Sequence, residues 1–185
     1  MRSLIPVLKK FEEADVLLQD MIGASGDMAR VQVYFSAFCS AARSVTFALQ
    51  YAMSERPGFL EWYDSWRDRL GADPAARYFL GARNQGEKTG LSAVACGIGS
   101  GWGPGIPSPT SFYFGPIPGV PFPRDDVFSA SHNHLTKLAE LLNSCLGRFD
   151  PGDDQPGLSP SGHLRQVLAK YAPPHVEVEK GLKHE

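Results

Sequence analysis

The feature that most constrains the fold is a regular apolar stripe through residues 28–54. Between Val31 and Ala52, apolar side chains recur every three or four residues, the spacing of one face of an α-helix. Asp27 is placed to cap the first turn, and Pro57 blocks continuation beyond the end. The stripe therefore predicts one long helix that buries a single face.

The same periodicity predicts four further helices. Three of them are expected at about residues 7–22, 58–70 and 129–149. The other begins at residue 74 and ends between residues 86 and 90. Asp73 and Pro74 mark the start of the fourth helix, as an N-cap carboxylate followed by proline at the first helical position. Because the first four helices are joined by short links, the sequence predicts an all-α, up-and-down bundle of four to five helices.

The stretch 97–123 has the opposite composition, since fourteen of its twenty-seven residues are glycine or proline. It predicts a long surface loop flanked by short strands at 91–96 and 111–114, with proline expected to prevent a regular sheet between them. Its glycines do not indicate a nucleotide site, because prolines rather than a helix follow them. The predicted organisation is a helical domain over 1–149, interrupted at 97–123, and a polar tail over 150–185 with one short helix.

Charge and cysteine content narrow the classes of function. A net charge of -2 argues against a strongly basic nucleic-acid coat protein. The three cysteines, Cys39, Cys96 and Cys145, are odd in number and widely spaced, which argues against a disulfide framework or a structural zinc site. No long apolar run predicts a membrane span. We expect a cytoplasmic protein without a metal or another cofactor.

Two histidines lie near the start of the last bundle helix. His132 falls on the expected apolar stripe and is predicted to be a hydrogen-bonded core residue. His134 points about 200° away on a helix, so the two cannot share a metal ion. Asp125 and Asp126 are predicted to precede the helix N-terminus, where carboxylates are favourable.

Three features of the second to fourth helices could carry chemistry. Arg43 lies beside the apolar stripe, where it needs a phosphate, several carbonyls or an acid on a neighbouring helix. Arg83 and Asn84 lie near the end of the fourth helix, where Arg83 could pair with Glu87 and Lys88 lies on the next face. The third feature is an aromatic cluster, whose spacing favours core packing over base stacking: Phe59, Trp62, Tyr63 and Trp66.

Over about residues 8–91 the chain resembles the HEPN superfamily of small helical bundles from bacterial and archaeal defence and toxin–antitoxin systems. The resemblance rests on the order of four segments: Phe38–Val45, Phe59–Tyr63, Asp73-Pro74 with Phe79, and Arg83-Asn84 with Gly90 behind. Active members are metal-independent ribonucleases with an Arg-Asn motif and a following histidine, in sites formed across a dimer.

The resemblance implies a role for each residue of this motif. Arg83 would bind the scissile phosphate and Asn84 would position neighbouring groups, but Lys88 stands where the histidine is expected. Lysine stays charged at neutral pH and cannot exchange protons as histidine does. We therefore expect Arg83, Asn84 and Lys88 to form an impaired catalytic site, with Arg43, Arg83 and Lys88 binding RNA.

The resulting prediction is a homodimeric, RNA-associated or regulatory module of a bacterial stress or defence system, possessing little or no endoribonuclease activity. A cognate regulatory protein is a further expected partner. Two other classes stay open at this point. One is a protein-interaction or structural bundle in which Arg83, Asn84 and Lys88 only cap and solubilise a helix end. The other is a small-ligand-binding bundle that uses the aromatic cluster and the 97–123 loop as a lid.

Overall fold

The computed structural model describes residues 3–98, 110–149 and 160–171. These residues form six α-helices and one two-stranded sheet, which confirms the predicted mostly-α fold. The helices are α1 (Ile5–Gly23), α2 (Met28–Met53), α3 (Phe59–Ala72), α4 (Pro74–Thr89), α5 (Val127–Phe149) and α6 (Pro160–Leu168). The strands are β1 (Val94–Ile98) and β2 (Thr110–Phe114), and a 3₁₀ turn, Ala169–Tyr171, follows α6.

Local chemistry sets the helix ends close to where the sequence predicts them. The Asp27 carboxylate accepts a hydrogen bond from the backbone N–H of Arg30 at 3.2 Å and so caps α2. Asp73 does the same for α4 by accepting from the N–H of Ala75 at 3.0 Å. Gly90 is the C-cap residue of α4, and its φ of 69° is a left-handed conformation in which glycine is unstrained.

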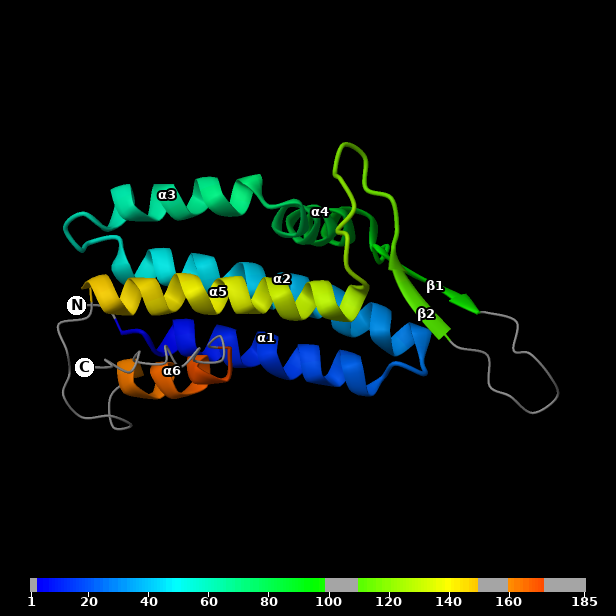
Figure 1. Ribbon diagram of the computed structural model, residues 1–185, viewed down its shortest axis with the longest axis horizontal. Coiled ribbons are helices and arrows are strands. Elements are labelled where there is room, and N and C mark those ends of the chain that lie inside the picture. Colours follow the sequence, from blue (N-terminus) through cyan, green and yellow to red (C-terminus); the bar gives the residue numbers. More distant parts are fainter. Residues whose placement is uncertain (1–2, 99–109, 150–159, 172–185) are drawn as a thin grey trace, which may run out of the picture.

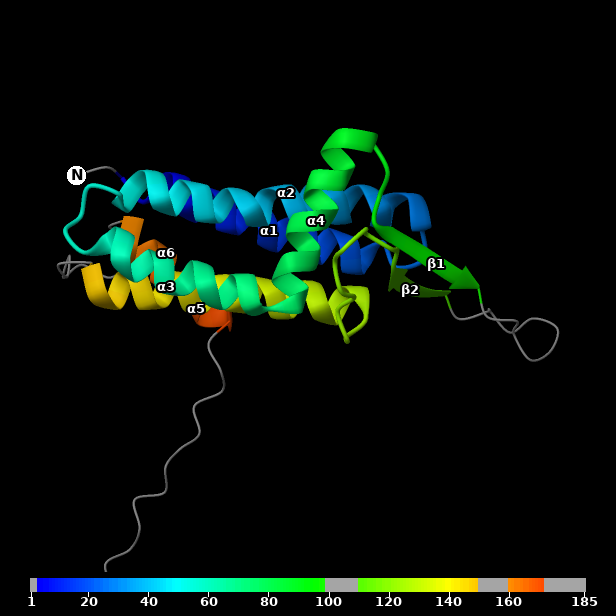
Figure 2. The same ribbon diagram turned by 90° about the horizontal axis from the view of Figure 1, so that it is seen from above.

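The long helices lie side by side, and α4 breaks this arrangement. Helices α1, α2, α3 and α5 run alongside one another in Figure 1, and their facing sides form one core. Viewed from above in Figure 2, α4 turns steeply across α2. The predicted aromatic cluster belongs to the core: Phe59 is fully buried, and Trp62 packs edge-on against Phe149 with ring centroids 5.3 Å apart.

The two strands pair despite the expectation that proline would prevent a sheet. They are antiparallel, with Val94 opposite Phe114 and Ile98 opposite Thr110. The prediction was wrong because the prolines up to Pro109 precede β2 in the sequence and do not interrupt either strand. The hydroxyl of Tyr78, on α4, donates to the carbonyl oxygens of Ala93 and Gly115 and so ties α4 to the sheet.

The segment after β2 packs against α4 instead of standing free as a surface loop. Ile117 is buried, and a Cβ added at Gly81 would meet a methyl carbon of Val120 at 3.2 Å and one of Ile117 at 3.4 Å. Glycine at this position of α4 therefore allows the segment to approach closely. The remainder of the predicted loop, residues 99–109, lies outside the described residues.

The short helix predicted in the C-terminal tail is α6, and it packs against α1 and α5 (Figure 1). Leu168 is fully buried, and the hydroxyl of Tyr171 donates to the carboxylate of Asp15 on α1 at 2.5 Å. No helix within the described ranges is long and apolar enough to cross a membrane.

Candidate ligand-binding site

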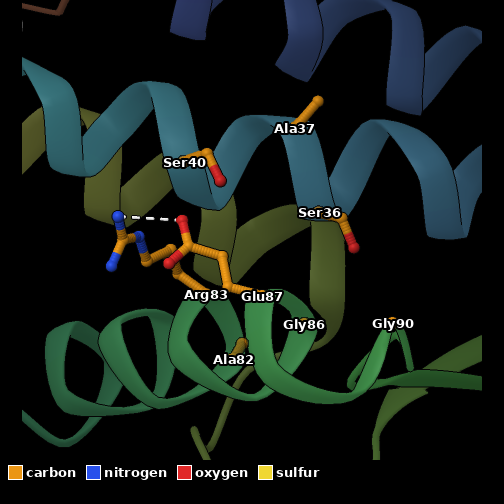
Figure 3. Close-up of a pocket in the computed structure, with 8 residues that line it drawn as sticks. All are labelled: Ser36, Ala37, Ser40, Ala82, Arg83, Gly86, Glu87 and Gly90. Atoms are coloured by element: carbon orange, nitrogen blue, oxygen red, sulfur yellow. Dashed lines mark ion pairs between the residues drawn. The ribbon is translucent and has the colours of Figure 1, made fainter.

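The first candidate site is a cleft of about 340 Å³ between α2 and α4, hereafter the α2–α4 cleft (Figure 3). Figure 3 shows the side chains of Arg83 and Glu87 lying between the two helices, with the hydroxyl groups of Ser36 and Ser40 projecting from α2. An Arg83 Nη atom lies 2.8 Å from a carboxylate oxygen of Glu87. A second Arg83 nitrogen donates to the Asn84 side-chain oxygen at 3.2 Å.

The α2–α4 cleft contains only one of the three residues predicted to form a catalytic site. Arg83 lines it, whereas Asn84 and Lys88 are exposed and do not. Residues five apart on a helix point about 140° away from each other, so Lys88 and Arg83 of the same molecule lie on different faces of α4. The structure instead forms the predicted ion pair between Arg83 and Glu87, which is worth a few tenths of a kcal/mol at a helix surface.

The second candidate site is a cavity of about 280 Å³ walled by α2, α3, α4 and α5, hereafter the arginine cavity. Its apolar lining includes Ala42, Leu70, Phe79, Leu80 and Leu138. Its polar lining includes Arg43, Arg67, Arg77, Tyr63, Thr46 and His134. The cavity thus combines an apolar wall with three arginine residues, one from each of three helices.

Two of the three arginines have no acidic partner among the described residues. Arg43 donates to the Thr46 hydroxyl at 3.1 Å, and its guanidinium carbon lies 4.2 Å from the ring centroid of Phe47. Within the described part of the chain, Arg43 does not pair with an acid on a neighbouring helix, which the sequence allowed as one of its possible partners. Arg77 is exposed, and its side chain makes neither an ion pair nor a hydrogen bond within the described ranges. Arg67 differs, because it pairs with Asp64 at 3.1 Å.

His134 forms part of the buried wall of the arginine cavity. Its side chain is 8% exposed and stacks on Phe79, with ring centroids 4.6 Å apart. The Nδ1 atom is buried and has no hydrogen-bond partner among the described residues. Burial lowers the pKa of His134 to about 4, against a raising effect of Asp73 and with a lowering effect of Lys137. The imidazole is therefore neutral at pH 7.

The prediction that His132 is the core histidine was wrong, since His132 is exposed and His134 is buried. The apolar positions expected further along this helix, such as Leu135 and Leu138, are buried, but in the first turns the buried face passes through Val127, Ser131 and His134 and leaves His132 exposed. The carboxylate of Asp126 accepts from the N–H groups of Phe128 and Ser129 and caps the helix as predicted.

Sequence reasoning identified Arg43 as a candidate but missed Arg77 and His134. Arg77 has no local motif around it, and the apolar pattern placed His134 on the wrong face. The lining residues come from four helices, so no spacing along the chain could have grouped them. Neither Trp62 nor Trp66, the aromatic residues of the small-ligand-binding alternative, lines the arginine cavity.

The fold by itself defines this chain only as a mostly helical bundle. A comparison of its sequence with models of known families gives one match. The model described as bacteriophage lambda protein ea47 matches residues 25–95, which cover α2, α3, α4 and the start of β1. The match spans less than half of the chain, so it establishes a similarity to this phage family. No curated protein and no solved structure matches the chain.

The match corrects the resemblance to the HEPN superfamily. It falls on the same helices that carried the resemblance and points to a different, phage-encoded family. The prediction of an RNA-associated, ribonuclease-like module of a defence or toxin–antitoxin system was therefore wrong. The two alternative classes considered with it gain no support from the comparisons.

Proposed function

We propose that this chain is a phage-type protein, related to the Ea47 family, that binds a small organic anion in the arginine cavity. The observation that carries the proposal is that Arg43 and Arg77, which line the cavity beside an apolar wall, have no acidic partner among the described residues. Guanidinium groups form strong, bidentate hydrogen bonds with carboxylates, phosphates and similar groups. An anion with an apolar body would satisfy both parts of the cavity.

The size of the cavity limits the ligand. At about 280 Å³, the cavity lies just below the roughly 300–1,000 Å³ that is usual for drug-sized ligands. The ligand is therefore about the size of one substituted ring. The matched segment 25–95 includes all three arginines of the cavity, whereas α5 adds His134 and Leu138 from outside it. This supports placing the site within the region that is similar to the phage family.

The proposal is tested by calorimetric titration with 4-methylbenzenesulfonate, which is an anion at every pH of interest. Its neutral analogue, 4-methylbenzenesulfonamide, has nearly the same shape. We expect the sulfonate to bind at least about tenfold more tightly than the sulfonamide, a difference of roughly 1.4 kcal/mol. Arg43→Met and Arg77→Met should each weaken sulfonate binding by a similar factor.

Arg124→Met is the matched control, because Arg124 is exposed and does not line the cavity. It should bind the sulfonate as the natural protein does. The proposal fails if the natural protein does not bind the sulfonate, or if Arg43→Met, Arg77→Met and Arg124→Met all behave alike.

A reducing cytoplasm remains our proposal for where the protein acts. Its support is that none of Cys39, Cys96 and Cys145 forms a disulfide, and that two of these thiols are buried. Burial raises the pKa of the Cys39 thiol, which keeps it protonated and unreactive. The homodimer expected from the sequence stays a prediction, which light scattering at micromolar concentration would test.

A further inference from the structure

The polar groups that line the arginine cavity differ in whether the protein itself satisfies them. The Tyr63 hydroxyl oxygen accepts from the Gln50 side chain at 3.1 Å. The Thr46 hydroxyl donates to the carbonyl oxygen of Arg43 at 2.8 Å. His134 is different, because its buried Nδ1 has no partner among the described residues.

An unmatched buried nitrogen is unusual enough to need a cause. Nearly all buried polar side-chain atoms in proteins make a hydrogen bond, because an unmade one costs the full price of removing the group from water. The His134 side chain is more than nine-tenths buried and lines the cavity, and its ring is held against Phe79. Because the side chain lines the cavity, a molecule that occupies the cavity would lie against the imidazole.

Burial favours the neutral form of the imidazole. It lowers the pKa of His134 to about 4, against the raising effect of Asp73 and together with the lowering effect of Lys137. A neutral imidazole offers one donor and one acceptor nitrogen. A hydroxyl group can both donate and accept, so it matches either nitrogen. The titratable and charged groups that line the cavity or act on His134 are Cys39 and Arg43 from α2, Tyr63 and Arg67 from α3, Asp73 and Arg77 at α4, and Lys137 from α5.

We propose that the ligand of the arginine cavity is a hydroxylated organic anion, whose hydroxyl group hydrogen-bonds the imidazole of His134 while its anionic group meets Arg43 and Arg77. This inference rests on the proposed function and adds a second polar group to the ligand. Arg77 and His134 both line the cavity, the first exposed and the second buried. A ligand whose apolar body separates its anionic group from its hydroxyl group would fit this arrangement.

The test compares two probes that differ at one group, 4-hydroxybenzenesulfonate and 4-methylbenzenesulfonate. A methyl group has about the size of a hydroxyl group but cannot form the hydrogen bond. We expect the natural protein to bind the hydroxyl probe at least about tenfold more tightly, because a site with a buried polar group rejects an analogue that leaves it unpaired. His134→Phe keeps an aromatic ring against Phe79, and it should abolish or reverse this preference.

Two further variants control the comparison. His132→Phe changes an exposed histidine of the same helix and should keep the full preference for the hydroxyl probe. His134→Gln retains a donor and an acceptor, and should keep part of it. Nitrogen NMR of the natural protein gives a readout that does not depend on any variant folding. The His134 ring signals should shift with the hydroxyl probe and much less with the methyl probe.

The outcomes separate this inference from the proposed function. If the natural protein binds both probes equally, with the expected dependence on Arg43 and Arg77, the inference is wrong and the proposed function stands. A hydroxyl preference that persists in His134→Phe also overturns the inference, because another group would then meet the hydroxyl. If neither probe binds, the proposed function fails, and the inference fails with it.

Discussion

Lowering the pH should destabilise the ligand-free protein through His134. Its pKa is about 4 in the folded protein, whereas an unperturbed histidine has a pKa of about 6.5. Between these two values the unfolded chain binds a proton that the folded protein does not. Stability therefore rises with pH through this window and is lost as the pH falls from about 6.5 towards 4.

The magnitude follows from the separation of the two pKa values. Over the whole window between these two pKa values, the free energy of unfolding falls by about 3 kcal/mol, because His134 is protonated only in the unfolded chain. At pH 5 the unfolded chain is almost fully protonated at this position, and about 2 kcal/mol has been lost. His134 is 8% exposed, so solvent screens little of this effect. For a domain of this size, the loss is a substantial part of the usual stability.

Urea unfolding at pH 7.5 and pH 5.0 measures the effect. The natural protein should lose about 2 kcal/mol more than His134→Phe between these two conditions, because phenylalanine does not titrate. His132→Phe should behave like the natural protein, since His132 is exposed. Equal losses for the natural protein and His134→Phe, within about 0.5 kcal/mol, would show that the imidazole is not held neutral by burial.

Two further substitutions test how the outer elements are attached to the bundle. Tyr78→Phe removes the hydroxyl that donates to the carbonyl oxygens of Ala93 and Gly115, and should cost about 1–3 kcal/mol in urea unfolding while weakening hydrogen-exchange protection of β1 and β2. Leu168→Ala truncates a fully buried side chain of α6 and should cost about 2–5 kcal/mol; unchanged stability would show that α6 does not dock on the bundle in solution.

The sequence by itself predicted most of the helical architecture, because the signals that begin and end a helix are local. Asp27, Asp73 and Asp126 each cap a backbone N–H group two or three residues away. Gly90 ends α4 through its own backbone conformation. The ion pair between Arg83 and its neighbour one turn later was readable for the same reason. Interactions of this range depend on the residues immediately around them.

Features that join distant segments were decided only by the tertiary structure. The pairing of β1 with β2 and the bond from Tyr78 to their ends link positions far apart in the sequence. The buried face was misread only in the first turns of α5, because Val127 and Phe128 are both apolar and only the packing partners decide which of them is buried.

The candidate site depends on such packing more than any other part of the molecule. The sequence favoured an acid on a neighbouring helix as the partner of Arg43, and the packing of the helices places none within its reach among the described residues. The depth at which His134 lies follows from how α5 packs beside α4, which also sets its neutral state at pH 7. A sequence specifies which side chains a helix presents on each face. The free energy of burying or pairing them depends on what the other helices bring to the same place, and only the assembled fold determines that.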